Sequence, residues 1–387
     1  MSRARQYLLP GLTVGLIAAL YIPSVSRSFG DVTSWSVGDL HINYAAGFIR
    51  RGLLGEIAFD LRERAGLSTG VLFPVLFVVL TAVQAALLAA LAWPLRSRPA
   101  LFLLAMLAPA LILFPAHDYG GYFRKEAFIT IGLFGHALLV RGTLNGALKT
   151  SSYARFLFIG LMPYLAVSTL IHENQAVFLP AHALLIYMAH GYPQLGPHIL
   201  RVQAPVLLPA TLCFLLALIF RGDAQSAAAI CSSWEGRAQT ACDAIGSLAW
   251  GYDQVWFYVR EVVTTPRSLG IYVVTIMLAL VPPVVLRRQL PRDGQAPLLL
   301  LVAAILPCLP LFLLGWDWGR WIHMISVAVV AIILAGCRRV PEPPRRSAWL
   351  GAAAVVAVLA YVSTWRVNSC CLPTSLEGGV MAVLSSW

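Results

Sequence analysis

Long apolar stretches alternate with short polar loops along the chain, which is the pattern of a bundle of membrane-spanning helices. A helix of about 20 apolar residues crosses a bilayer core of about 30 Å. The sequence predicts an all-α polytopic membrane protein with about 11 transmembrane helices, its N-terminus inside and its C-terminus outside. The predicted spans are 7–24, 69–95, 100–115, 127–140, 156–171, 175–188, 202–220, 268–286, 296–314, 321–336 and 348–365.

The charges between the spans set this orientation. With the N-terminus inside, the inner loops hold 15 of the 28 Lys and Arg residues but only two of the 17 acidic residues, Asp293 and Glu342. An excess of Lys and Arg marks cytoplasmic loops, so the net charge of +11 reflects topology and does not indicate nucleic-acid binding. Arg outnumbers Lys by 26 to 2, which together with this topology favours a bacterial inner membrane, with the active site facing the periplasm.

Composition excludes a soluble domain. The chain is 59% hydrophobic and 12% charged, whereas soluble domains are about 45–50% apolar and about 25% charged. The inner loops are too short to hold a nucleotide-binding domain, and no Gly-rich phosphate loop occurs.

Several spans are short, and charged residues occupy the missing length at their outer ends. These residues are Arg124, Lys125 and Glu126, then His172 and Glu173, then Asp317 and Arg320. A charge facing lipid at that depth costs about 2.5–3.5 kcal/mol. The pattern therefore predicts a polar cavity that opens to the outer side.

Two outer loops are long, at 25–68 and 221–267. In the first, apolar positions recur every four residues from Leu53 to Leu61, which predicts an amphipathic interfacial helix, with a shorter helical stretch over 42–49. The aromatic stretch 248–262 predicts a second interfacial helix, in the fourth outer loop, that is either a membrane anchor or a wall of a lipid-entry groove.

Four of the seven cysteines fall on the outer side: Cys231, Cys242, Cys370 and Cys371. An oxidising compartment permits disulfides among them. Cys231 and Cys242 form the favoured local pair, but the sequence does not choose among the three connectivities.

The first outer loop carries four candidate site residues, and one of them, His41, would bind substrate. Asp39, beside His41, is either a general base or the N-cap of the 42–49 helix. Arg50 and Arg51 suit phosphate oxygens, because paired guanidiniums present bidentate forks, but they equally suit lipid headgroups.

The remaining candidates lie at three other outer ends. Asp118 shares a short loop with Arg124, Lys125 and Glu126, which form either a site or an ion-pair network. His172 and Glu173 either orient a substrate or bind a metal, although no paired-histidine ligand spacing accompanies them. Asp317 and Arg320 share a helical face with His323 and either bind substrate or lock a helix end. His136 and His182 lie within spans and read as hydrogen-bonded core residues.

The string Asp39-Leu40-His41-Ile42-Asn43-Tyr44, followed by Gly52, is similar to the acid–aromatic–Gly stretch of protein O-mannosyltransferases and aminoarabinose transferases. The two long outer loops follow spans 1 and 7, as in the GT-C superfamily of membrane glycosyltransferases, which the chain resembles over residues 1–270 in topology. The resemblance implies that Asp39 is the base that activates the acceptor. It also implies that Asp118 or Glu126 is the acidic residue of the second loop.

These patterns predict a glycosyltransferase that moves a sugar from a polyprenyl-phosphate-linked donor to a lipid, glycan or protein acceptor. Residues 1–267 would form the catalytic membrane module and 268–387 the C-terminal helices and outer tail. The phosphate would be held by Arg50, Arg51, Arg124, Lys125 and Arg320. The alternative is an O-antigen or capsule polymerase or ligase. A transporter or flippase is less favoured, because the polar residues gather at one face. A divalent metal is the only cofactor that the sequence suggests.

Overall fold

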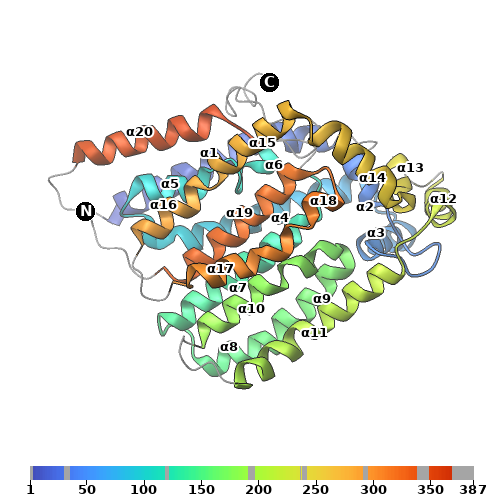
Figure 1. Ribbon diagram of the computed structural model, residues 1–387, viewed down its shortest axis with the longest axis horizontal. Helices are drawn as coiled ribbons and strands as arrows, with labels where there is room; N and C mark the ends of the chain where they lie inside the picture. The colour runs from blue at the N-terminus through green and yellow to red at the C-terminus, as the bar shows by residue number, and fades with distance from the viewer. Residues whose placement is uncertain are drawn as a thin grey trace.

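The computed structural model describes residues 3–29, 35–117, 122–190, 197–235, 237, 242–290, 295–337 and 348–367. All regular structure in these ranges is helical, and none of it is strand. Long helices run side by side in a bundle, and short helices gather at one end of it (Figure 1). The chain is thus an all-α bundle.

Seven helical segments are long and apolar enough to cross a membrane. Their bounds are Tyr7–Ser28, Thr69–Leu95, Glu126–Leu144, Thr150–Ile171, Arg201–Ile219, Pro266–Gln289 and Trp318–Ala335. The corresponding elements are α1 (Arg3–Ser28), α4 (Thr69–Ala92) with η1 (Trp93–Leu95), α7 (Glu126–Leu144), α8 (Thr150–Phe156) with η3 (Leu157–Leu161) and α9 (Met162–Ile171), α11 (Pro197–Ile219), α15 (Pro266–Ala279) with α16 (Val281–Gln289), and α19 (Trp318–Ala335). This confirms a multi-pass membrane protein.

The other predicted spans also contain helices, but shorter or broken ones. They are α5 (Pro99–Leu107), η4 (Glu173–Phe178) with α10 (Leu179–Ala189), α17 (Leu298–Ile305) with η7 (Leu306–Cys308) and α18 (Leu311–Leu314), and α20 (Ala348–Thr364). The full count of about eleven crossings and the sides of the two termini stay predictions.

The helix expected over 100–115 ends early, at Leu107. Pro109 explains this end, because proline disfavours the helical conformation of the residue before it, and Ala108 is extended with ψ 130°. The chain then turns through buried residues to the short helix α6 (Phe114–His117). Phe114 and Pro115 of α6 line the pocket described below.

Helix α19 forms the centre of the bundle, and nearly all its residues from Trp321 to Ala335 are buried. A helix that is apolar on every side is buried on every side, and the run of Val, Ala, Ile and Leu in α19 has that character. It packs against α7, α15 and α16. Asp317 precedes α19 and Arg320 lies in its first turn, next to Glu126 at the start of α7.

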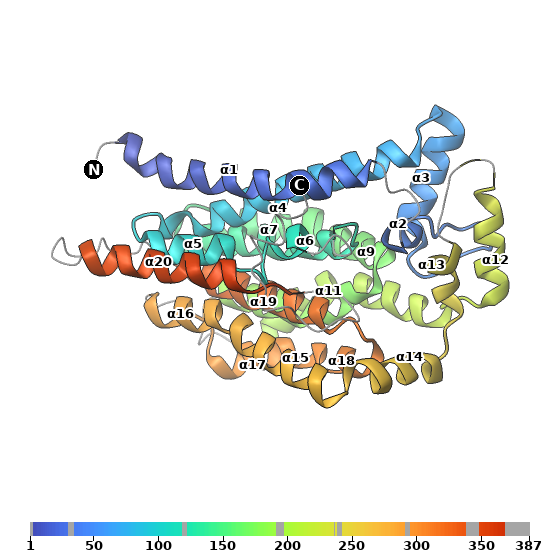
Figure 2. The ribbon, with the colours of Figure 1, turned by 90° about the horizontal axis from the view of Figure 1, so that it is seen from above.

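The two long loops form a cap at one end of the bundle (Figure 2). The cap contains α2 (Trp35–Leu40), α3 (Gly52–Ala65), α12 (Ala224–Ser233), α13 (Cys242–Gly246), η5 (Ser247–Ala249), α14 (Tyr252–Tyr258) and η6 (Val259–Val263). The predicted amphipathic helix in the first loop is α3, and the aromatic helix is α14 with η6. The disulfide Cys231–Cys242, which ties α12 to α13, has the predicted local pairing. Cys370 and Cys371 lie outside the described residues.

The helical stretch predicted over 42–49 is wrong, because this segment consists of turns and bends. The helix lies earlier, at α2, so Asp39 stands in its last turn and is not an N-cap. The turns have local causes. The Asn43 side chain accepts a hydrogen bond from the backbone N–H of Ala45, and Gly47 has φ +87°.

Candidate active site

Aromatic side chains pack around His41 and hold the first outer loop in place. The His41 ring is fully buried, with its centroid 4.7 Å from that of Trp234 and 5.1 Å from that of Phe73. Trp234 Nε1 donates a hydrogen bond to the His41 carbonyl at 2.8 Å. Burial lowers the pKa of His41 to about 4, so the ring is neutral. His41 therefore anchors the loop, and its predicted role in substrate binding stays a prediction.

Helix α3 follows the loop in close contact with it. A side chain at Gly55 would lie 2.0 Å from the carbonyl oxygen of Ile42, so only glycine permits this approach. Arg51, which precedes α3, has φ +63° and is the only non-glycine residue with positive φ in the described ranges. Such backbone strain persists where surrounding contacts enforce it, often at functional sites.

Arg51 joins two carboxylates from different loops. Its Nε lies 2.9 Å from both oxygens of Glu173, and its Nη2 donates to Glu173 Oε1 at 2.6 Å. Its Nη1 lies 3.4 Å from Asp39 Oδ1. Arg50 adds a longer ion pair to Glu173, at 3.7 Å. The strained backbone of Arg51 therefore aims its guanidinium at the carboxylates of α2 and η4.

Lys125 connects the second outer loop to the first. Its side chain is only 1% exposed, and its Nζ lies 3.3 Å from Asp39 Oδ2. The same ammonium donates to the backbone carbonyls of Asp39 at 2.8 Å and Arg51 at 3.2 Å. Three acceptors satisfy its three protons, so Lys125 holds the two loops in register.

Glu126, the first residue of α7, continues the chain of contacts toward α19. Its Oε1 accepts a hydrogen bond from Arg320 Nη1 at 2.9 Å and lies 3.3 Å from His172 Nε2. The other nitrogen of His172 lies 3.4 Å from Glu173 Oε2. Arg320 also pairs with Asp317. His172 therefore links the Arg51–Glu173 pair to the Arg320–Asp317 pair.

These contacts form one continuous group, called here the charged cluster: Asp39, Arg50, Arg51, Lys125, Glu126, His172, Glu173, Asp317 and Arg320. All nine were predicted as site residues, and the fold brings all nine together from four separate segments. The last residues, Asp317 and Arg320, come from the C-terminal part of the chain. The site therefore combines residues from both predicted parts.

The charged cluster stabilises its members in the ionised form. Burial alone would raise the pKa of Asp39, but Lys125 and then Arg51 lower it below its usual value. The same balance between burial and Arg51 holds the pKa of Glu173 well below its usual range. Burial would lower the pKa of His172, but Glu126 and Glu173 raise it. Both carboxylates are therefore charged near neutral pH, and the imidazole favours its cationic form.

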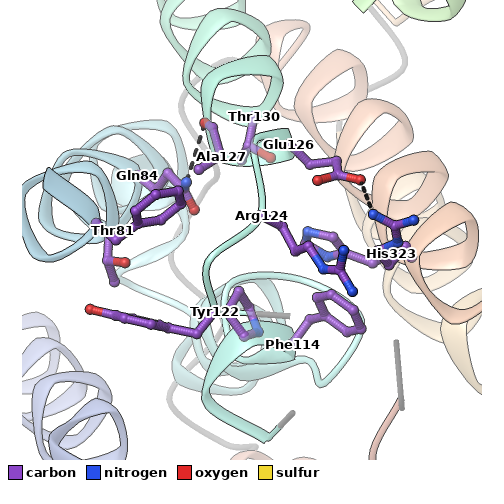
Figure 3. Close-up of a pocket in the computed structure, with 12 residues that line it drawn as sticks. Thr81, Gln84, Phe114, Tyr122, Arg124, Glu126, Ala127, Thr130 and His323 are labelled. Carbon is purple, nitrogen blue, oxygen red and sulfur yellow. Dashed lines mark hydrogen bonds and ion pairs between the residues drawn. The ribbon is translucent and has the colours of Figure 1, made fainter. Parts of the chain in front are cut away.

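A narrow pocket lies beside this cluster, between α4, α6, α7 and α19 (Figure 3). Arg124, Glu126 and Arg320 are the predicted site residues that line it. The other lining residues were not predicted to do so: Phe77, Thr81, Gln84, Phe114, Pro115, Tyr122, Ala127, Thr130 and His323. In sequence, residues such as Gln84 look like isolated polar positions in an apolar span, and no spacing links them to the outer loops.

Asp118 lies outside the described residues. Among the residues that the structure describes, no three His, Cys, Asp or Glu side chains come together as a metal site would require, and a divalent metal stays a prediction from sequence alone. His136 and His182 hydrogen-bond to each other at 3.0 Å within the bundle, as expected for core histidines.

Comparisons with known proteins matched no family model, no curated protein and no solved structure. The resemblance to the GT-C superfamily therefore rests on loop topology and on the stretch 39–52.

Proposed function

We propose that the chain is a membrane glycosyltransferase that moves a sugar from a polyprenyl-phosphate donor at the outer face. The observation that carries this proposal is the charged cluster, in which cations from three segments converge at one end of the bundle. Arginine and lysine at such a site suit a phosphate and its growing negative charge as the sugar departs. The placement of the site at the periplasmic face of a bacterial inner membrane is part of the proposal.

The cations are ion-paired but remain partly accessible. The Arg50 and Arg51 side chains are 25% and 24% exposed, and that of Arg320 is 12% exposed. A donor phosphate would compete with Glu173 for the fork of Arg51. When the phosphate replaces the Glu173 carboxylate on Arg51, one charge-assisted bidentate contact replaces another. This exchange costs less free energy than breaking the Arg51–Glu173 pair with no new partner.

Exposed aromatic side chains on the cap support a lipid-linked substrate. The cap presents exposed aromatic side chains on α14, with Tyr252 58% and Phe257 54% exposed. Aromatic rings favour the boundary between lipid and water. A polyprenyl chain reaching the charged cluster from the outer leaflet would pass this boundary.

The test uses the full chain in lipid nanodiscs with a panel of polyprenyl phosphates that carry neutral or amino hexoses. Mass spectrometry measures release of the free polyprenyl phosphate. We expect turnover of at least one donor and a loss of about 100-fold or more in Arg51→Met. The matched control is Arg64→Met, since the Arg64 side chain is 80% exposed and, among the described residues, pairs with Asp60 alone. Turnover of none of the donors would refute the proposal, and a ladder of products would identify a polymerase.

A further inference from the structure

The pocket beside the charged cluster contains a carboxylate oxygen without a partner. Both cations that bind Glu126 contact its Oε1. Its Oε2 is buried and, within the described part of the chain, accepts no hydrogen bond. Figure 3 shows one oxygen of Glu126 joined to Arg320 and the other directed away from it. A buried acceptor of this kind costs about 1–3 kcal/mol or more when it stays unpaired, so it favours a ligand that donates a proton.

Tyr122 carries a second unpaired polar atom, which Figure 3 shows on the side of the pocket away from Glu126. Tyr122 lines the same pocket, and its Oη is also buried without a hydrogen-bond partner among the described residues. The surrounding wall combines aromatic rings with hydroxyl and amide groups: Phe77, Phe114, Thr81, Gln84 and Thr130. Rings together with a few placed hydrogen-bonding groups suit the hydroxyl-bearing end of a sugar. Arg124 and Arg320 also line the pocket, and Arg320 is paired with Glu126 there.

Asp39 has a different environment. Its Oδ1 pairs with Arg51 and its Oδ2 with Lys125, so each oxygen already has a cation. It does not line the pocket. Lys125 cannot easily leave, since it also binds two backbone carbonyls of the first loop. Asp39 is therefore suited to fixing Lys125 and the two loops rather than to receiving a proton.

We infer that this pocket is the acceptor subsite, that it takes a hydroxyl group of a neutral sugar, and that Glu126 is the base. The inference rests on the proposed function and departs from the resemblance, which assigns the base to Asp39. The acceptor oxygen bonds to the anomeric carbon of the donor. The bond from that carbon to the phosphate oxygen breaks, and its electron pair leaves on the polyprenyl phosphate. The proton of the acceptor hydroxyl passes to Glu126 Oε2.

The pocket is narrow, so only the reacting end of an acceptor enters it. Arg320 links the two halves of the reaction, because it binds Glu126 Oε1 and belongs to the cations proposed to hold phosphate. When Arg320 turns toward a donor phosphate, Glu126 loses one of its two cations and becomes a stronger base. Donor binding would then precede activation of the acceptor.

The experiment compares Glu126→Gln with Asp39→Asn in nanodiscs, using the donor that the wild type cleaves and a neutral oligosaccharide acceptor. Glu126→Gln is expected to lower the transfer rate at saturating donor by about 100- to 10,000-fold. Its affinity for farnesyl phosphate, used as a donor probe, should change less than fivefold. Azide, which needs no proton removed, should restore turnover of the donor and yield a glycosyl azide.

Controls separate chemistry from folding. Glu56→Gln replaces a carboxylate of α3 that does not line the pocket, keeps an oxygen for the Tyr44 N–H and should retain wild-type transfer. Glu126→Asp should recover part of the rate. Near-normal transfer by Glu126→Gln, loss of activity without azide rescue, or preference of the wild type for a peptide hydroxyl would each overturn the inference. A wild type that cleaves no donor would instead refute the proposed function.

Discussion

Individual side chains in the charged cluster divide into those that fix the loops and those that remain available to a ligand. Lys125 belongs to the first group, since its three acceptors lie on two elements of the first loop. Glu126 and Arg320 belong to the second group, because Glu126 Oε2 and Arg320 Nε are buried without partners in the described residues. Neighbouring residues 125 and 126 thus have opposite roles.

Replacement of Lys125 tests the first role. Lys125→Met leaves Asp39 with Arg51 as its one paired cation and frees two backbone carbonyls, so we expect a loss of about 3–5 kcal/mol in the free energy of unfolding. Tryptophan fluorescence during denaturation in detergent measures it. The chain has only one other lysine, the exposed Lys149, and Lys149→Met is the matched control.

The double variant Lys125→Met, Asp39→Asn should lose less unfolding free energy than the sum of the two single-variant losses. Additive losses would show that the pair is not coupled.

The ends of helices, both short and long, place the site residues. Asp39 lies in the last turn of α2, Arg51 precedes α3, Glu173 begins η4, Glu126 begins α7 and Asp317 precedes α19. Carboxylates at helix N-termini also gain from the helix dipole, which applies to Glu126. The elements meet closely only where glycine permits it, as at the contact between α3 and the first loop.

Gly55→Ala tests that contact. The added methyl group would meet the Ile42 carbonyl at 2.0 Å, so α3 or the loop must shift. We expect destabilisation by about 1–3 kcal/mol, measured by thermal unfolding, together with weaker donor binding because Arg51 lies between the two segments. Gly135→Ala is the control, since a methyl group there meets no atom within 4 Å in helix α7. Equal stability of the two variants would contradict a close contact at Gly55.

At the scale of the whole molecule, the two long loops form one cap. The charged cluster joins the first of these loops to the ends of bundle helices, through the pairs of Asp39 with Lys125 and of Arg51 with Glu173. The α1 helix begins at the opposite end of the bundle from the cap (Figure 2). This separation agrees with the charge pattern of the loops, although the side of the membrane that each end faces is still a prediction.

Cysteine labelling in intact bacterial cells tests that orientation. Asp60→Cys lies on α3 in the cap, and Lys149→Cys lies in a loop predicted to be inside. In a chain that otherwise keeps only Cys231 and Cys242, an impermeant maleimide should label the first position directly. It should label the second only after the membrane is opened. The reverse result would place the charged cluster in the cytoplasm and exclude a periplasmic reaction.

The sequence by itself determined the membrane class, the positions of the long helices and the members of the charged cluster. These features follow from local physics: apolar length fits a bilayer, and charges at membrane depth need polar surroundings. α5 ends before the predicted boundary of its span because Pro109 interrupts the helix, which is also a local effect. The sequence did not locate the turns after α2, because Asn43 and Gly47 outweighed the apolar spacing of that segment.

Only the tertiary structure decided how the clustered charges pair and which polar residues share a pocket. Asp39 and Glu126 look alike in sequence, but one has a cation on each oxygen and the other leaves one oxygen unpaired. That difference arises from α19, which delivers Arg320 from far along the chain to Glu126 Oε1. Pairing between distant segments depends on how helices pack, and neither composition nor local spacing encodes it.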